Sequence, residues 1–139
     1  MATKKITKAG LRIFNLEMAG LHAVQALAIL LLAKNFTVPV STSFLTFNSA
    51  SKSLEPATKT LFNLPLAWLI VAFLALSACA HLVIATIYNK RYNQGLTKGI
   101  NRARWIEYSL SASTMMVAIA LLVGIYDLSL LICIFSLVA

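Results

Sequence analysis

One segment, RWIEYSLSAST at residues 104–114, gathers side chains that could take part in proton or ligand chemistry. Glu107, Ser111 and Thr114 follow at spacings of four and three residues, so on a helix a carboxylate and two hydroxyl groups share one face. A carboxylate about one turn inside an apolar segment is by default a functional site, because a buried charge is costly. The alternative is structural: Glu107 pairs with Arg104 and favours the helix N-terminus through the helix dipole. The spacing supports both interpretations equally.

Two histidines with polar neighbours lie in two other apolar segments. Gln25 follows His22 by three residues, and Ser77 precedes His81 by four, so each pair shares a helix face. A histidine inside a membrane span faces the bundle interior or a hydrated cavity, where it joins a proton relay or a hydrogen bond between helices. Together with Glu107, three segments each offer one titratable group, which predicts one shared polar pocket.

Motifs for other chemistries are missing from the sequence. It contains no P-loop, GxGxxG, HExxH or GxSxG, so nothing favours an enzyme. Cys79 and Cys133 lie in apolar runs without metal-ligand spacing, and we expect them to be buried packing thiols and not part of a metal site. The net charge of +8 does not indicate nucleic acid, because the basic residues flank the apolar runs and form no stripe with aromatic residues.

The elements that carry these side chains are predicted to be membrane-spanning helices. Of the 139 residues 60% are hydrophobic and 12% charged, and the mean hydropathy is +0.84. A helix needs about 20 apolar residues to cross a hydrocarbon core of about 30 Å. Three runs satisfy this, at residues 11–34, 64–88 and 102–126, and a shorter apolar run occupies residues 127–139. The predicted fold class is all-α and transmembrane, with the lipid bilayer as a partner.

A polar connection rich in serine and threonine occupies residues 35–63. Within it, FTVPV and TSFLTF alternate apolar and hydroxyl residues, which predicts a short β-hairpin outside the membrane with Ser41 between the two strands. Pro39 restricts the first strand to a sheet edge. Pro56 and Pro65 are expected to mark the approach to the second span. The connection between the second and third spans is expected to be a short basic loop.

The distribution of lysine and arginine predicts the orientation of the spans, because cytoplasmic flanks carry an excess of these residues. The N-terminal flank and the second loop hold nine of them, and the first loop holds three. The nine are Lys4, Lys5, Lys8, Arg12, Lys90, Arg91, Lys98, Arg102 and Arg104; the three are Lys34, Lys52 and Lys59. We therefore expect a multi-pass protein of the cell membrane with a cytoplasmic N-terminus and the hairpin outside.

The last apolar run is expected to continue beyond this sequence. LSLLICIFSLVA would form about 18 Å of helix, which is too short to cross a bilayer. A carboxylate at Ala139 would then lie near the membrane centre, where a charge costs at least a few kcal/mol. Residues 1–139 are accordingly expected to be the N-terminal part of one membrane domain.

RWIEYSLSAS resembles the third-helix motif of the heliorhodopsins, a family of retinal-binding membrane proteins. The resemblance extends over nearly the whole chain. FNLEMAGLHAVQALAILLLA is similar to the first helix of the family, LALSACAHLVIATIYNKRY to the second, and MMVAIALLVGIYDLSLLICIF to the third and fourth. A cytoplasmic N-terminus and a long first extracellular loop agree with this family as well.

The resemblance implies a rhodopsin-like seven-helix bundle, of which about three and a half helices are present here. It implies a photoreceptor with all-trans retinal bound as a protonated Schiff base, a sensory or regulatory role without ion pumping, and a homodimer at full length. Glu107 would be the counterion. The candidate neighbours in a hydrated cavity near the Schiff base are His22, His81, Gln25, Ser77, Asn101, Tyr108 and Ser111. Ala112 stands where some relatives have a further serine.

One departure from the family concerns the lysine that binds retinal, which lies on the seventh helix of these proteins. Every lysine of the present sequence lies in a flank or a loop, so we expect this chain alone to bind no covalent retinal. Two other functions stay open. One is a small membrane subunit that packs against the helices of a partner. The other is a proton- or ion-translocating protein in which Glu107 and the histidines form a relay.

Overall fold

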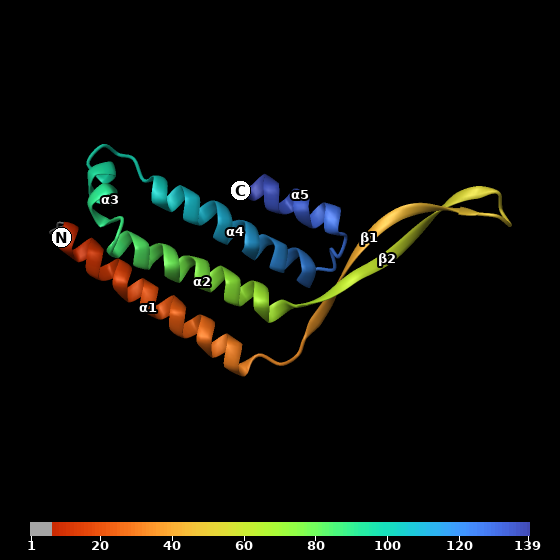
Figure 1. Ribbon diagram of the computed structural model, residues 1–139, viewed down its shortest axis with the longest axis horizontal. Coiled ribbons are helices and arrows are strands. Elements are labelled where there is room, and N and C mark those ends of the chain that lie inside the picture. Colours follow the sequence, from red (N-terminus) through yellow and green to blue (C-terminus); the bar gives the residue numbers. More distant parts are fainter. Residues whose placement is uncertain (1–6) are drawn as a thin grey trace, which may run out of the picture.

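Three long helices lie side by side in the computed structural model, which describes residues 7–139. They are α1 (Lys8–Leu32), α2 (Leu66–Ala85) and α4 (Arg102–Leu122), and α2 packs between the other two (Figure 1). A shorter helix, α5 (Leu128–Val138), packs against α4. Each long helix is sufficiently long and apolar to cross a membrane, so the three predicted runs form helices of the expected kind.

The end of α4 comes earlier than the predicted end at residue 126. Gly124 adopts a φ of 94°, a left-handed conformation that glycine reaches without steric cost. Its N–H donates to the carbonyl of Leu121 at 3.2 Å, and the N–H of Ile125 donates to the carbonyl of Ala120 at 2.9 Å. This pair of hydrogen bonds closes the helix in the pattern of a Schellman motif.

A short helix, α3 (Asn89–Leu96), occupies the connection that was predicted to be a basic loop. Its sequence, NKRYNQGL, is short and mostly polar, with Tyr92 and Leu96 as its apolar side chains, so the pattern did not indicate a helix. It also ends in a Schellman motif, since the N–H groups of Gly99 and Ile100 donate to the carbonyls of Leu96 and Gly95. The loop folds back so closely that a Cβ atom on Gly95 would lie 2.7 Å from the carbonyl oxygen of Ile100.

The predicted hairpin is present, but its strands were assigned wrongly. FTVPV and TSFLTF were expected to be opposite strands, yet both belong to β1 apart from Phe36 (Thr37–Asn48), which pairs antiparallel with β2 (Ser53–Pro65). The β2 sequence contains Pro56, which lies opposite Leu45 and does not mark the start of a helix. Proline hides a strand pattern, but a two-stranded sheet consists of edge strands, which tolerate it.

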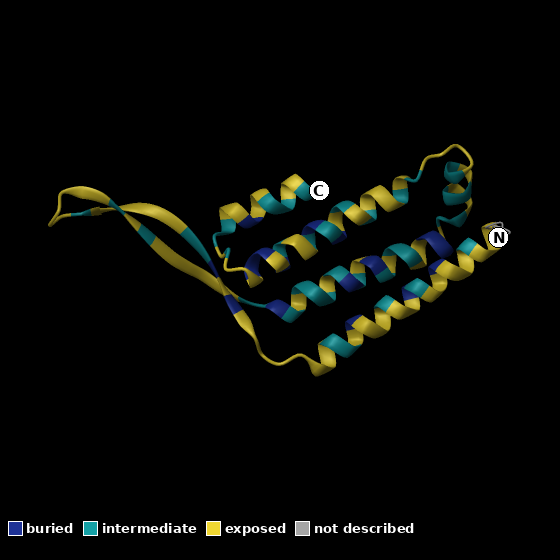
Figure 2. Cartoon of the chain, turned by 180° about the vertical axis from the view of Figure 1, so that it is seen from behind, coloured by how far each residue is buried: buried dark blue, intermediate teal, exposed yellow. Residues whose placement is uncertain are grey.

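The buried core lies where the base of the hairpin meets the helices. Figure 2 shows buried positions at this base and along facing sides of the helices, whereas most of the hairpin is exposed. Within the hydrophobic cluster at this base, Leu121 and Val40 are buried most completely, at 0% and 1% exposure. The remaining buried members of this cluster are Val38, Leu66, Ala118, Ala120 and Leu131. Much of the other helix surface is apolar and exposed, as expected for helices that lipid surrounds.

The prediction that both cysteines are buried is wrong. Cys79 on α2 and Cys133 on α5 are exposed, and both are free thiols. The sequence of α2 is apolar around nearly its whole circumference, so composition could not show which face packs against a neighbour. Side chains become buried only where adjacent helices face each other, and these two positions lie outside those contacts.

Asp127 joins the hairpin to the start of α5. One carboxylate oxygen, Oδ2, accepts the backbone N–H of Ser43 in β1 at 3.0 Å. The other, Oδ1, accepts the N–H groups of Ser129 and Leu130 at 3.0 and 3.3 Å and so caps the helix. One side chain therefore holds two elements that are far apart in the sequence.

The attachment at Asp127 is expected to weaken in acid. Desolvation raises the pKa of this carboxyl group, but hydrogen bonds from Ser43, Leu130 and Ser129 outweigh it, and the net pKa is lowered from 3.8. Because the pKa is lower in the folded state, the stabilisation is present above the unfolded pKa and disappears as the pH falls through the folded pKa. We expect hydrogen-exchange protection of the Ser43 amide to decrease over that range. In Asp127→Asn it should be weak already at neutral pH. Protection that is equal in wild type and variant would contradict this expectation.

Candidate functional site

The Glu107 carboxylate lies between α2 and α4, where two hydroxyl groups bind it. Ser111, one turn along α4, donates to Oε1 at 2.9 Å, and Ser77 of α2 donates to the same oxygen at 2.9 Å. Both serines are buried, and Glu107 is half-buried. Thr114 shares the predicted helix face but does not join this group, because its hydroxyl donates to the carbonyl of Leu110.

The structural alternative for Glu107, a pair with Arg104, is not the arrangement observed. The hydrogen-bond partners of the carboxylate are Ser77 and Ser111, although Arg104 lines the same cavity. Within residues 7–139, both hydrogen bonds to the carboxylate end on Oε1, which leaves Oε2 available for another donor. A half-buried anion with one available oxygen can accept a hydrogen bond from a cationic group.

Two histidine rings stack between α1 and α2. The ring centroids of His22 and His81 are 5.8 Å apart, and the rings are inclined by 22°. Nδ1 of His22 lies 3.1 Å from Oε1 of Gln25, the neighbour that the spacing predicted. His81 instead pairs across the helices, with its Nδ1 2.8 Å from Oδ1 of Asn15. Ser77, the neighbour predicted for His81, donates its hydrogen bond to the carboxylate of Glu107 instead.

Asn15 is a site residue that the sequence analysis did not select. It is 6% exposed, and its amide nitrogen donates to the carbonyl of Leu11 at 2.7 Å, which turns Oδ1 toward His81. Because Oδ1 of Asn15 can only accept, Nδ1 of His81 is the donor of this hydrogen bond. The signal was available, because a polar amide in an apolar span needs a partner.

A cavity of about 420 Å³ lies between α1, α2 and the start of α4. Its polar wall brings together residues from α1, α2 and α4, the Asn101 cap of α4 and Tyr92 of α3: Asn15, His81, Tyr92, Asn101, Arg104, Glu107 and Tyr108. Four predicted site residues do not line it. Ser77 and Ser111 donate hydrogen bonds to Glu107 from outside the cavity. His22 stacks on His81 and contacts Gln25. The chain thus has a polar cavity with a supporting layer of polar side chains.

The family of the chain follows from a sequence comparison that agrees with this architecture. The profile of the protein family named Heliorhodopsin matches residues 11–139. The chain belongs to the heliorhodopsin family. The match includes the Glu107 segment and the hairpin, and it makes the chain a multi-pass membrane protein of the retinal-binding photoreceptor kind. A comparison with curated proteins found no significant match.

The described part of this heliorhodopsin contains a residue that fits as the anion of a covalent retinal site, but no lysine in the interior of a span. Retinal linked to a lysine as a protonated Schiff base is a cation, and in a low-dielectric interior a cation needs a nearby anion. Glu107, with its available Oε2, can supply that anion. The described lysines lie at the first residue of α1, in the hairpin connection and around α3, outside the interior of every span: Lys8, Lys34, Lys52, Lys59, Lys90 and Lys98.

Proposed function

We propose that this heliorhodopsin is a light-sensing receptor with a sensory or regulatory role, in which Glu107 is the counterion of the protonated retinal Schiff base. The observation that carries the proposal is the Glu107 carboxylate, held by Ser77 and Ser111 and lining a cavity between three helices. All-trans retinal, when bound, supplies the absorption of visible light. The carboxylate provides the fixed negative charge.

The other polar residues position this charge and line the space around it. Ser77 and Ser111 hold Oε1 of Glu107 and so restrict rotation of the carboxylate. Oε2 is thereby kept in one orientation for the Schiff base. The Asn15–His81 pair crosses from α1 to α2 and fixes the facing wall of the cavity. Hydrogen bonds of this kind between helices help to keep a membrane site in one geometry.

We also propose the orientation that the basic residues predict. The start of α1 and helix α3 lie at one end of the layer of helices, and the hairpin lies at the other end (Figure 1). Lys4 and Lys5 lie outside the described residues, which leaves seven of the nine basic residues near the α3 end and three in the hairpin connection. In this proposal the α3 end is cytoplasmic, the hairpin is outside, and the bilayer covers the apolar faces.

The complete receptor of this proposal is a seven-helix bundle that forms a homodimer. Its retinal-linking lysine comes from a polypeptide segment other than the described residues, because the described lysines lie outside the span interiors. Expression of the native gene with all-trans retinal is expected to yield a visible absorption band that hydroxylamine bleaches. If the membrane protein accumulates but shows no such band, the proposal is wrong.

The 139-residue chain alone is expected to bind no covalent retinal. Lysines in loops are exposed to water, where a Schiff base hydrolyses and stays largely unprotonated, so no stable visible band should form. The measurement is an absorption spectrum of the purified chain after incubation with all-trans retinal, before and after hydroxylamine. A visible band that hydroxylamine removes would overturn this expectation.

Proton translocation is the second candidate function, because His81 and Glu107 line one cavity and His22 stacks on His81. Such a chain of titratable groups can form a relay across part of a membrane. Light-induced proton movement in proteoliposomes that disappears in Glu107→Gln would favour this function over a purely sensory role. Unchanged flux in the variant would exclude a relay through Glu107.

A further inference from the structure

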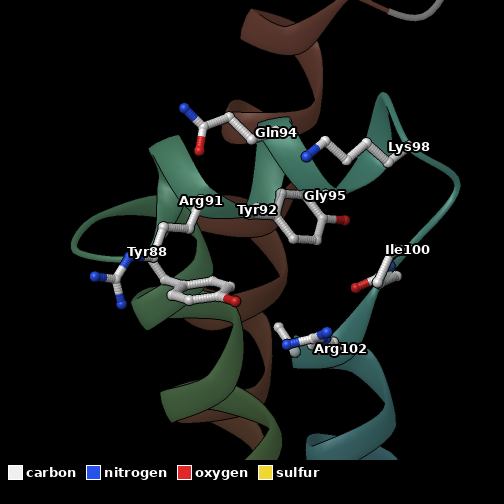
Figure 3. Close-up of a pocket in the computed structure, with 10 residues that line it drawn as sticks. Tyr88, Arg91, Tyr92, Gln94, Gly95, Lys98, Ile100 and Arg102 are labelled. Carbon is white, nitrogen blue, oxygen red and sulfur yellow. The ribbon is translucent and has the colours of Figure 1, made fainter.

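A second cavity, of about 210 Å³, lies beside α3 at the end of the bundle opposite the hairpin. Figure 3 shows its side chains, which come from Tyr88 at the start of α3, from α3 and its following loop, and from the start of α4. Arg91, Lys98 and Arg102 provide three positive charges, and Tyr88 and Tyr92 provide two aromatic rings. None of the residues that line this cavity carries a carboxylate.

The shape of this basic cavity is set by the backbone. The Schellman motif at the end of α3 folds the loop against Gly95, where even a Cβ atom would collide with the carbonyl oxygen of Ile100. Asn101 then caps α4 by accepting the N–H of Arg104 at 3.2 Å. These fixed contacts bring the loop that carries Lys98 next to the first turn of α4. The positive charges are therefore gathered in a folded structure and are not scattered along a flexible loop.

The charge balance around the cavity favours an anionic ligand. The chain between residues 86 and 106 contains five lysines and arginines and no aspartate or glutamate. Guanidinium groups form paired hydrogen bonds to phosphate, and tyrosine rings favour the headgroup level of a bilayer. A phosphate group at the membrane surface matches both features.

An apolar groove continues from the basic cavity along the bundle. It measures about 390 Å³, lies between α2 and α4, and shares Tyr88 and Ala103 with the basic cavity. Its walls include Cys79 and Val83 of α2 and Leu110 of α4, all of which are exposed. A ligand that occupies both spaces must have an anionic head and an apolar chain. Free phosphate would use only the first space.

We propose that this combined site binds one anionic phospholipid. Arg91, Lys98 and Arg102 hold the headgroup phosphate, and one acyl chain lies in the groove between α2 and α4. Anionic lipids attract basic protein segments to the membrane surface, and basic pockets beside membrane-spanning helices bind the headgroups of such lipids. None of the three cations lines the cavity with His81 and Asn15. Glu107 lines both that cavity and the groove, so the two sites are neighbours, and the test measures bound lipid without any retinal.

The test uses the protein in nanodiscs of phosphatidylcholine with increasing phosphatidylglycerol, followed by native mass spectrometry of the retained lipid. The triple variant Arg91→Gln, Lys98→Gln, Arg102→Gln is expected to bind phosphatidylglycerol about 100-fold more weakly. A matched control removes three positive charges at the other end of the spans, with Lys34, Lys52 and Lys59 replaced by Gln. The control should retain the lipid as the wild type does.

A third variant, Cys79→Trp, separates a lipid from free phosphate. The indole fills the groove without a change of charge, so it is expected to weaken lipid retention, and inorganic phosphate should not displace the lipid from the wild type. Equal retention in the basic triple variant and its control would overturn the proposal. Full retention in Cys79→Trp, with displacement by inorganic phosphate, would overturn it in favour of a simple phosphate site.

Discussion

In the complete receptor loaded with retinal, replacement of Glu107 by Gln is expected to abolish most of the visible absorption at neutral pH and to move the absorption to the near ultraviolet. An opposite charge within about 4–6 Å shifts a protonation equilibrium by a factor of about 10 to 1,000, so its loss favours the unprotonated Schiff base. Ser77 and Ser111 would remain, but hydroxyl groups carry no charge to replace it. The measurement is an absorption spectrum as a function of pH in a buffer without halide, because a small anion could occupy the vacated position.

Two variants control this prediction. Glu107→Asp keeps the charge on a shorter side chain and should keep a visible band with a shifted maximum. Glu17→Gln removes an exposed carboxylate from α1, at a position that does not line the Glu107 cavity, and should leave the spectrum unchanged. A visible band in Glu107→Gln with the wild-type dependence on pH would show that Glu107 is not the counterion.

The substitution Leu121→Ala is expected to lower the free energy of unfolding by about 2–5 kcal/mol, because it removes buried methyl groups and leaves a cavity. Leu121 is 0% exposed and belongs to the cluster that contains Val40 of the hairpin and Leu131 of α5. Its loss should therefore loosen the base of the hairpin together with the last helix. Unfolding of the protein in mixed micelles by increasing dodecyl sulfate, followed by circular dichroism, measures the change.

Leu122 provides the matched control, since it is the next residue of the same helix and is 60% exposed. Leu122→Ala makes the same chemical change without a cavity and should alter stability by no more than about 0.5 kcal/mol. Similar losses in both variants would mean that the cluster around Leu121 does not hold the hairpin to the helices.

The spans could be predicted from the sequence because the membrane imposes their length and composition. The predicted runs at 11–34, 64–88 and 102–126 correspond to Lys8–Leu32, Leu66–Ala85 and Arg102–Leu122. The Glu107–Ser111 hydrogen bond could also be predicted, because residues four apart on a helix are always neighbours. The end of α4 was misjudged and α3 was missed, although the glycines that close both helices are visible in the sequence.

The hairpin shows a different limit. Its existence followed from the alternating pattern of β1, but β2 was missed because proline and charged residues interrupt its alternation. Asp127 was recognised only as the start of an apolar run. Its hydrogen bond to Ser43, 84 residues away in the chain, depends on how the hairpin returns to the helices. No local pattern encodes that return.

The sequence by itself determined the membrane class, the family and the helix that carries Glu107. Only the tertiary structure decided that Ser77 binds Glu107 while His81 turns to Asn15, and that both cysteines face outward. The reason is physical. Helical periodicity places residues on the faces of one helix, but packing sets the rotation of each helix against its neighbours. An evenly apolar helix such as α2 leaves that rotation undefined until its neighbours are in place.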